Sequence, residues 1–573
     1  MAFIRRMQTA HSIIACSSRT VLFNKVHSSI RGSRTFVDNV SKQPQIKSIS
    51  DLPGPVSLPV IASSWTFFVG ARNEPLGKRM LLSQEKLVNK YGRIFRMQLP
   101  GITIVSIMDP VDVAKVLRAE TKYPQRLQFP ILRYYREKRQ KIPGVFFADG
   151  PEWYKYRSVL SKRMLRPKEV ADYASGFNEI ITDFIHRLRT VREPSGSEKE
   201  NEVRELDSEL FKWSFESVAE MLFDKRFGCL EPEVNKEAQT FIKAVGDFLY
   251  NAIAVNFLPT WFYKIYETQQ VKTFFSSLDT MYEYADLFIG RKINELEEQQ
   301  TVQSRHEVQS RHSSEALSRH SPEVQSRHSP EAQSRHSPEV QSRHSSEAQS
   351  RHSSEAQSRH LSEATEGDKA GFFDFLLSSG KLTKDDLLAS VIDVLFAGVD
   401  TTSNTMQWML YMMAKNPDKQ NILRHEVLSV LGDTTLATPT TLAQMPYLKA
   451  WVRETLRLYP VLSVIPRRPT EDLILSGYLI PGGTATIHFL TYYMGRDENV
   501  FEDAEAFKPE RWLRRKDVTL TEAAEAFSSI PFGFGTRMCL GRRIAELELH
   551  LYWPESCSSL RFPIPLMRRT LSR

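Results

Sequence analysis

Apolar residues recur along most of the chain at the spacing of amphipathic helices, and only short stretches alternate as strands do. Between residues 169 and 292, helical patterns alternate with short breaks. Residues 120–150 follow neither period, so we expect a long irregular segment there. The pattern therefore predicts a mainly α-helical protein with small β-sheets, of the α+β class. The most regular stretches predict helices at Leu81–Tyr91, Val111–Arg118, from Gly150 onward and at Pro446–Leu458, and strands at Ile94–Leu99 and Ile102–Ile107.

The stretch Thr383–Lys415 is apolar on most sides and predicts a helix on the order of 48 Å long through the centre of the molecule. Thr383 and Asp386 form a capping box at its start. Its middle, Ala397-Gly398-Val399-Asp400-Thr401-Thr402, places a glycine, a carboxyl and hydroxyls inside an otherwise apolar helix. Such a break in the pattern indicates either a functional site or a kink with solvent-facing polar groups.

Charge and cysteine content exclude some functions. The net charge is +8, but six of the 76 basic residues precede the first acid, Asp38. Without them the charge is about +2, which gives no indication of nucleic-acid binding. The four cysteines show no close spacing. They fit a reducing compartment and predict neither a disulfide framework nor a zinc site.

The first 36 residues are rich in Arg, Ser and Thr and contain no acid. This composition predicts a mitochondrial transit peptide, with a disordered basic tail as the alternative. No apolar run here reaches the length that spans a bilayer. We expect the folded part to begin near the proline-rich segment Leu52–Pro55.

An eight-residue unit, Ser-Arg-His-Ser-(Ser/Pro)-Glu-(Ala/Val)-Gln, recurs from Ser310 to Thr365. Each unit has too few apolar atoms to repay the entropy of ordering. We therefore expect residues 301–365 to be a disordered insert, with metal binding by the histidines or phosphorylation at Ser-Pro as alternatives. The folded domain then comprises residues 50–300 and 366–553.

The stretch Phe532–Gly541 carries the most specific chemistry. It combines the lone Cys539 with three glycines, Arg537 and a helix expected to begin at Gly541. Glycines let the backbone approach a flat cofactor, and a helix N-terminus with a nearby arginine favours an ionised thiol. Arg537 is also placed to pair with an anionic group of that cofactor. The alternative is a buried structural cysteine in a glycine-rich turn.

This stretch resembles the haem-binding loop of the cytochrome P450 family, Phe-x-x-Gly-x-Arg-x-Cys-x-Gly, at every fixed position. The resemblance implies a cytochrome P450 fold with haem b between the long central helix and the loop. It implies Cys539 as the axial iron ligand and residues 120–150 lying over the cofactor. It also implies further roles: cofactor binding by Trp153, Arg157, Arg467, Phe532 and Arg537, proton delivery through Asp400 and Thr401, a structural cluster of Glu454, Arg457 and Arg511, and a substrate cavity lined by Leu462–Ile465.

Several of these matches are weak when taken alone. A Trp and an Arg four residues apart, such as Trp153 and Arg157, usually form a surface stacking contact. An ion pair three residues apart, such as Glu454 and Arg457, is common on exposed helices. It is their order along the chain, together with the cysteine loop, that carries the resemblance.

Other features resemble the mitochondrial class of the family, which receives electrons from a [2Fe-2S] ferredoxin and its NADPH-dependent reductase. Lys449, Arg453, Arg542 and Arg543 are expected on the same side as the cysteine and would steer an acidic partner. The residue sequence of the chain most resembles that of the group of sterol 27-hydroxylase, vitamin D hydroxylases and a retinoid desaturase. The resemblance implies a haem-thiolate monooxygenase that hydroxylates or desaturates a lipophilic sterol, secosteroid or retinoid, at the matrix side of the mitochondrial inner membrane. Residues 254–263, dense in aromatics without a clear helical face, indicate a peripheral membrane contact or a core segment.

The C-terminus departs from the family pattern. The helix after Gly541 meets Pro554, which we expect to end it. Residues 554–573 show no strand alternation, so we expect an atypical tail in place of the family's C-terminal strands. The alternative function is therefore a catalytically impaired or inactive product.

Overall fold

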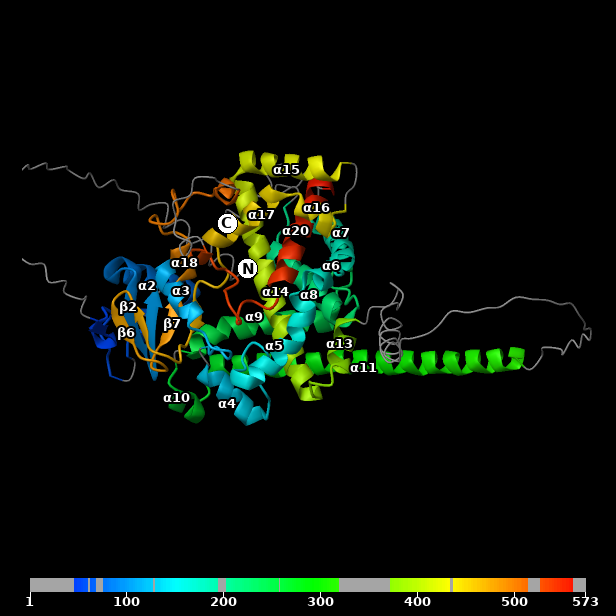
Figure 1. The fold of residues 1–573 in the computed structure, drawn as a ribbon, viewed down its shortest axis with the longest axis horizontal. Coiled ribbons are helices and arrows are strands. Elements are labelled where there is room, and N and C mark those ends of the chain that lie inside the picture. The colour runs from blue at the N-terminus through cyan, green and yellow to red at the C-terminus, as the bar shows by residue number, and fades with distance from the viewer. Residues whose placement is uncertain are drawn as a thin grey trace, which may run out of the picture.

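The chain is described here by a computed structural model, which covers residues 46–59, 62–67, 76–126, 129–193, 202–256, 258–318, 371–432, 436–513 and 526–559. The predicted transit peptide, 1–36, and the repeat from residue 319 onward lie outside these ranges. Within them, a smaller region that contains the strands lies beside a larger helical region (Figure 1).

Helices dominate the described residues and the sheets are small, which confirms the predicted class. The helices of the first half are α2 (Leu76–Tyr91), α3 (Pro110–Arg118), α4 (Pro130–Arg139), α5 (Gly150–Met164), α6 (Pro167–Ala171), α7 (Ala174–Val191), α8 (Leu206–Phe223), α9 (Lys236–Asn256), α10 (Thr260–Ile265) and α11 (Gln269–Ser318). Those of the second half are α13 (Phe372–Ser378), α14 (Lys384–Lys415), α15 (Pro417–Leu431), α16 (Pro439–Ala443), α17 (Pro446–Leu458), α18 (Thr491–Met494) and α20 (Arg542–Ser559). Short 3-10 helices are η1 (Ile49–Asp51), η2 (Ser64–Phe67) and η3 (Pro509–Trp512).

The larger sheet has the strand order β2-β3-β7-β4. Its strands β2 and β3 form the antiparallel hairpin that the alternation predicted, and Gly101 in the turn has a φ of 79°. Strand β7 pairs parallel with β3 and antiparallel with β4, which brings Arg467 next to Ile487. A smaller sheet has the order β1-β6-β5. The strands of both sheets are β1 (Lys47–Ser48), β2 (Ile94–Leu99), β3 (Ile102–Ile107), β4 (Ile465–Arg467), β5 (Leu473–Leu475), β6 (Tyr478–Ile480) and β7 (Thr486–Phe489).

Helix α14 runs through the middle of the helical region, as its apolar pattern predicted (Figure 1). Its capping box is present: the Thr383 hydroxyl accepts from the Asp386 N–H at 3.2 Å, and the Asp386 carboxylate accepts from the Thr383 N–H at 2.8 Å. The helix packs against α8, α11, α17 and α20. Because neighbours surround it, its apolar residues are buried on most sides.

Two segments are more regular than the sequence suggested. The stretch 120–150 contains α4, in which Pro130 occupies the first turn and Ile131, Leu132 and Tyr135 are buried. The many charged residues between these apolar positions hid the helical period. Residues 254–263, in which no clear helical face was seen, contain the end of α9 at Asn256 and the start of α10 at Thr260.

Pro554 does not end the last helix, contrary to the sequence prediction. Helix α20 continues through it to Ser559, although the proline lacks the N–H that would bond to the carbonyl of His550. Trp553 and Glu555 on either side are 3% and 6% exposed. Burial on both sides stabilises the helix where the hydrogen bond is lost. The predicted tail, 554–573, is thus helical as far as Ser559, and residues 560–573 lie outside the described ranges.

Helix α11 extends into the segment predicted to be disordered. It includes residues 301–318, so the prediction is wrong for these residues. Extending an existing helix requires no new nucleation, and Glu, Gln, Arg and Ala favour it. Figure 1 shows this end of α11 projecting away from the other helices.

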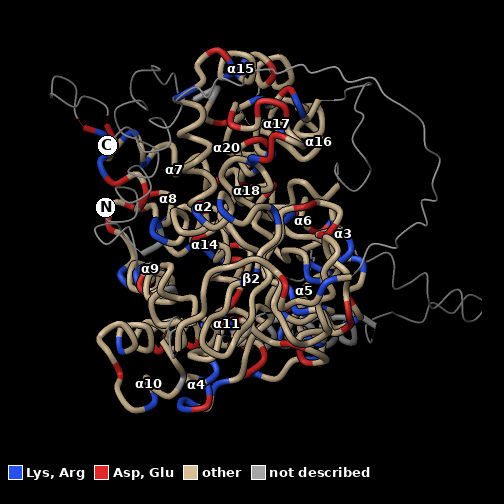
Figure 2. Tube along the Cα trace, turned by 90° about the vertical axis from the view of Figure 1, so that its left-hand side faces the viewer, with Lys and Arg blue, Asp and Glu red and all other residues tan. Residues whose placement is uncertain are grey.

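In the described ranges, none of the helices combines the length and the apolar composition needed to cross a bilayer. Along the trace, Lys and Arg alternate with Asp and Glu rather than gathering by sign (Figure 2). Local clusters, and not a field of one sign over the whole molecule, therefore determine the electrostatics of the site.

Candidate active site

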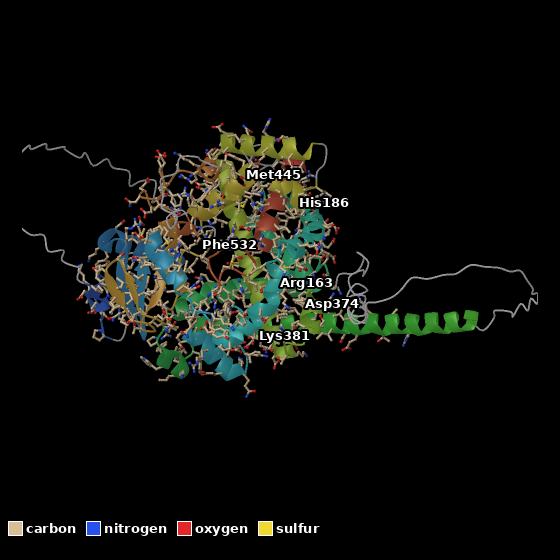
Figure 3. All side chains as sticks on the ribbon, viewed as in Figure 1. Arg163, His186, Asp374, Lys381, Met445 and Phe532 are labelled. Carbon is tan, nitrogen blue, oxygen red and sulfur yellow. The ribbon has the colours of Figure 1, made fainter. Side chains whose placement is uncertain are left out.

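The cysteine loop lies between the two regions of the molecule, where Phe532 is labelled in Figure 3. The Cys539 N–H donates to the Phe532 carbonyl at 2.8 Å and closes the loop. Gly533 and Gly535 have φ values of 69° and 78°, in the left-handed region that favours glycine. A Cβ on Gly535 would also lie 2.9 Å from the carboxylate of Glu120. The loop therefore requires glycine at these two positions, for the conformation of its own backbone and for the contact with Glu120.

The Cys539 side chain is exposed, yet protein atoms surround it closely enough to raise its pKa. Burial is the largest cause of that rise. The Gly541 N–H and the guanidinium groups of Arg126 and Arg157 act against it and lower the pKa. The thiol thus faces a space enclosed by the chain, and the nearby cations favour its ionised form.

Four arginines gather beside this thiol, from four parts of the chain: Arg126, Arg157 on α5, Arg467 on β4, and Arg537. Burial lowers the pKa of Arg126 to about 9 and of Arg537 to about 10, and the neighbouring arginines contribute to both shifts. At neutral pH these groups remain charged. The cluster is therefore a buried concentration of positive charge.

Two carboxylates offset part of that charge. Arg537 is paired with Asp149, and Arg467 is paired with Glu120. Burial raises the pKa of Glu120, while Arg467, Arg126 and Arg537 act to lower it. Four guanidinium groups against two carboxylates leave an excess of positive charge.

Arg537 is held most firmly of the four. Its Nε donates to the Pro124 carbonyl at 3.0 Å, and its Nη2 donates to the Ala148 carbonyl at 2.7 Å. Its guanidinium lies over the Trp153 ring, 4.3 Å from the ring centre. The predicted Trp153 and Arg537 thus contact each other. The Trp153 ring thus packs against one face of the Arg537 guanidinium.

Two residues of the site, Arg126 and Glu120, were not predicted from the sequence. Arg126 donates from Nη2 to the Arg537 carbonyl at 2.7 Å, and so binds the cysteine loop directly. Neither residue belongs to a local motif of the kind used to find the other sites. A weak signal was available, because each lies in the segment that the resemblance placed over the cofactor.

The second part of the site is the polar break in α14. The Thr401 hydroxyl donates to the Ala397 carbonyl at 2.7 Å, as a hydroxyl four residues on can do. Burial raises the pKa of Asp400 to about 6. Ser214 of α8 donates to the Gly398 carbonyl at 3.0 Å, and a Cβ on Gly398 would lie 2.5 Å from a methyl of Val218. Glycine at 398 thus permits α8 to approach α14 closely.

Helix α17 and the 3-10 helix η3 together form a buried ion cluster. The Glu454 carboxylate accepts from Arg457 at 2.7 Å and from Arg511 at 3.0 Å. The Trp512 indole N–H donates to the same carboxylate at 2.8 Å, and Arg457 also donates to the Ala504 carbonyl at 2.6 Å. The structure therefore brings together the three residues that the sequence analysis grouped. Removing one partner from such a buried pair costs about 3–5 kcal/mol.

The four basic residues expected at a docking face are all exposed. Lys449 and Arg453 lie on α17, which packs against the helix that carries Arg542 and Arg543. Lys449 donates to the Ala443 carbonyl, Arg453 lies over the Trp512 ring, and Arg542 pairs with Glu546 at 3.0 Å. The two helices pack together, and Arg542 and Arg543 follow the cysteine loop directly in the chain.

The residues present fit haem. Within the described ranges, buried nitrogens of Arg126, Arg467 and Arg537 have no hydrogen-bond partner in the chain: Nε, Nη2 and Nη1 respectively. Haem carries two propionates, which would supply both the acceptors that these nitrogens lack and the charge that balances the cluster. A thiol on the same side provides the soft ligand that such iron takes.

A family model described as Cytochrome P450 matches residues 59–323 and 329–559 of the chain. The mitochondrial sterol 26-hydroxylase of Rattus norvegicus is 31% identical over 526 residues, which cover 92% of this chain and 85% of that protein. Cytochrome P450 27C1 of Aquarana catesbeiana is 32% identical over 474 residues, 82% of this chain and 75% of that protein. The mitochondrial 1,25-dihydroxyvitamin D(3) 24-hydroxylase of Rattus norvegicus is 28% identical over 511 residues, 88% of this chain and 82% of that protein. The resemblance seen in the sequence is thereby confirmed.

Proposed function

Because the chain belongs to the cytochrome P450 family of haem-dependent monooxygenases, we propose that it hydroxylates or desaturates a lipophilic sterol, secosteroid or retinoid. The names of similar proteins support this substrate class: a sterol 26-hydroxylase and a 1,25-dihydroxyvitamin D(3) 24-hydroxylase. The observation that carries the proposal is the convergence of Cys539, the arginine cluster and the polar break of α14.

Haem b is the cofactor that we propose. Cys539 would ligate its iron, and Arg126, Arg157, Arg467 and Arg537 would hold its propionates. When bound, the haem supplies the activation of dioxygen and the transfer of one oxygen atom. Trp153 and Asp149 orient Arg537, and Glu120 orients Arg467, so contacts within the chain hold both guanidinium groups.

Proton delivery falls to α14 in this proposal. The Thr401 hydroxyl donates to the Ala397 carbonyl, so its oxygen lone pairs are free to accept a hydrogen bond. In a relay it would release its own proton as it takes up another. Burial raises the pKa of Asp400 to about 6, which lets this carboxyl take up and release a proton close to neutral pH. We therefore propose Asp400 as the proton donor and Thr401 as the relay.

An acidic [2Fe-2S] ferredoxin, with its NADPH-dependent reductase, is the electron donor that we propose. The exposed Lys449, Arg453, Arg542 and Arg543 would attract it to the side of the cysteine loop. The mitochondrial names of similar proteins support this donor and a mitochondrial location.

We further propose a peripheral position at the matrix side of the inner membrane. Trp261 and Ile265 of α10, with the adjacent Tyr266, are 58%, 81% and 63% exposed. Apolar side chains gathered on a surface in this way suit contact with lipid.

The experiment that tests the function is reconstitution. The purified holoprotein is supplied with ferredoxin, reductase and NADPH, and with a sterol, a secosteroid or a retinoid. We expect a product heavier by one oxygen atom or lighter by two hydrogen atoms, with turnover that falls as salt screens the docking face. Turnover of none of the three substrate classes would contradict the proposal.

The cysteine variant provides the matched test of the cofactor site. Cys539→Ala should abolish the spectrum of thiolate-ligated, carbon monoxide-bound haem, because no other described cysteine lies at the site. Cys229→Ala, which alters a buried cysteine elsewhere, should keep that spectrum. A normal spectrum in Cys539→Ala would remove Cys539 from the iron.

The alternative of an impaired product rested on a last helix cut short at Pro554. Since α20 continues to Ser559 and remains packed against α7, α15 and α17, that ground is removed. The second ground, the atypical tail in place of C-terminal strands, concerns residues 560–573, which lie outside the described ranges.

A further inference from the structure

Helix α14 carries a second buried carboxyl, Asp393, about two helical turns before Asp400. It is 5% exposed and lies outside the polar break that the sequence analysis singled out. Its carboxylate accepts from the backbone N–H of Phe146 at 2.8 Å. This buried acid therefore holds the backbone of a segment that is distant in the sequence.

The segment is a tight turn, residues 144–148, that approaches α14 closely. A Cβ on Gly144 would lie 2.2 Å from the Ala389 carbonyl and 2.4 Å from the Asp393 carboxylate. The Phe147 and Ala148 N–H groups both donate to the Gly144 carbonyl, at 3.2 and 2.9 Å. Only glycine permits this approach, so the turn is built to lie against Asp393.

The same turn is bound at its other end by the arginine cluster. Arg537 donates to the Ala148 carbonyl at 2.7 Å and pairs with the adjacent Asp149. Arg126 lies over the Phe146 ring, 5.6 Å from the ring centre. The turn therefore connects α14 with the residues proposed to hold the cofactor.

Two aromatic side chains project from this turn onto α14. Phe146 and Phe147 lie 5.4 and 6.0 Å from Phe396, measured between ring centres. Phe396 directly precedes Ala397 and Gly398, where the polar break begins. Phe146 and Phe147 are only partly buried, so they present apolar surface beside the reaction site.

We propose that Asp393 is a positioning residue that sets the aromatic wall of the substrate cavity, by holding the turn 144–148 and its Phe146 and Phe147 against α14. The inference rests on the proposed function for the identity of the cavity. It predicts that Asp393 governs binding of bulky apolar molecules and not the chemical step.

The charges around Asp393 come from two other elements. Arg136 of α4 lies over the Phe147 ring at 4.7 Å and favours the ionised carboxylate. Tyr282 of α11 donates to the Ile142 carbonyl at 3.4 Å, and burial and Asp393 raise its pKa to about 12. Burial in turn raises the pKa of Asp393 to about 7. Because an amide oxygen can also accept from the Phe146 N–H, the hydrogen bond can be separated from the charge by substitution.

The test compares Asp393→Ala with Asp393→Asn. For each holoprotein, haem difference spectra give the affinity for clotrimazole, a large aromatic imidazole, and for plain imidazole. Deuterium exchange of the 144–148 amides is measured in parallel. Asp393→Ala should weaken clotrimazole binding about tenfold, leave imidazole binding and haem content unchanged, and speed exchange at 146 about tenfold, since a buried hydrogen bond is lost. In Asp393→Asn, the clotrimazole affinity and the slow exchange at 146 should both be largely retained.

Asp385→Ala is the matched control, because Asp385 is an exposed acid in the first turn of the same helix. It should match the wild-type protein in all three measurements. Unchanged clotrimazole affinity or unchanged exchange in Asp393→Ala would overturn the proposal. So would equal losses in Asp393→Ala and Asp393→Asn, or a loss of haem in Asp393→Ala. Exchange and azole binding do not require turnover, so a failure of the proposed substrate class would be seen separately, as absent product with these shifts intact.

Discussion

Burial shifts pKa values in opposite directions in two parts of the site, the arginine cluster and the carboxyl groups on and next to α14. In the arginine cluster, burial lowers the pKa of Arg126 to about 9 and of Arg537 to about 10, so both stay charged at neutral pH. Along and behind α14, burial raises the pKa of Asp400 to about 6 and of Glu548 to about 8. One side therefore holds permanent positive charge, and the other holds protons that can exchange near neutrality.

The difference follows from the side chains available. A guanidinium has so high an intrinsic pKa that burial cannot neutralise it, and it suits the fixed recognition of an anionic group. A carboxyl starts lower and is brought by burial into the range in which it can donate and accept protons. Under the proposed function, cofactor binding and proton delivery are thus assigned to separate groups of residues.

The largest effect is expected when an arginine is removed from the arginine cluster. Arg537→Ala removes two hydrogen bonds to backbone carbonyls, the pair with Asp149 and the contact with Trp153. We expect most of the haem to be lost and the free energy of unfolding to fall by about 3–5 kcal/mol, as for a broken buried ion pair. Haem content per protein and chemical denaturation measure both. Arg163→Ala, which breaks a pair with Glu169 on α6, should retain haem. Full haem content in Arg537→Ala would remove this residue from the propionate site.

An intermediate effect is expected on the proton-handling side. Thr401→Ala should keep its haem but release peroxide in place of product, with about tenfold less product per NADPH, because the relay hydroxyl is gone. Thr405→Ala removes the equivalent hydroxyl one turn later, which donates to the Thr401 carbonyl at 2.8 Å, and should remain coupled. Peroxide and product are measured against NADPH consumed. Equal coupling in the two variants would contradict a relay through Thr401.

The smallest expected effect is on the pH dependence of the free energy of unfolding. Glu548 lies on α20, which packs against α14, and its carboxyl interacts with Ser217 and Thr402. Burial raises its pKa from 4.5 to about 8. The folded protein therefore holds a proton that the unfolded chain releases, and the cost of folding grows as pH rises from about 4.5 to about 8.

Glu548→Gln removes this cost. Its free energy of unfolding should equal that of the wild-type protein below about pH 4.5 and exceed it by a few kcal/mol above about pH 8. Denaturant titrations across that range measure the difference, and Glu546→Gln, a half-buried position paired with Arg542 on the same helix, is the matched control. A constant difference at every pH would show that Glu548 carries no raised pKa.

Much of the fold was predictable where the pattern is local. Strands β2 and β3 alternate apolar and polar residues around Pro100-Gly101, and α14 repeats its apolar positions over its whole length. Helix α4 was missed because charged residues separate its buried positions, Ile131, Leu132 and Tyr135. The continuation of α20 past Pro554 was missed because the compensation comes from packing, which a local rule about proline does not include.

The sequence by itself determined the loop of Cys539 and the polar break at Asp400 and Thr401, because each depends on residues within one turn or one helix. Only the tertiary structure decided what surrounds them. Arg126 meets Arg537 across 411 positions of sequence, and Asp393 meets Phe146 across 247. Such contacts form between a side chain and a distant backbone group, and any residue can supply a backbone N–H or carbonyl. They therefore leave little trace in the identity of the partner, and they appear only once packing has brought the two segments together.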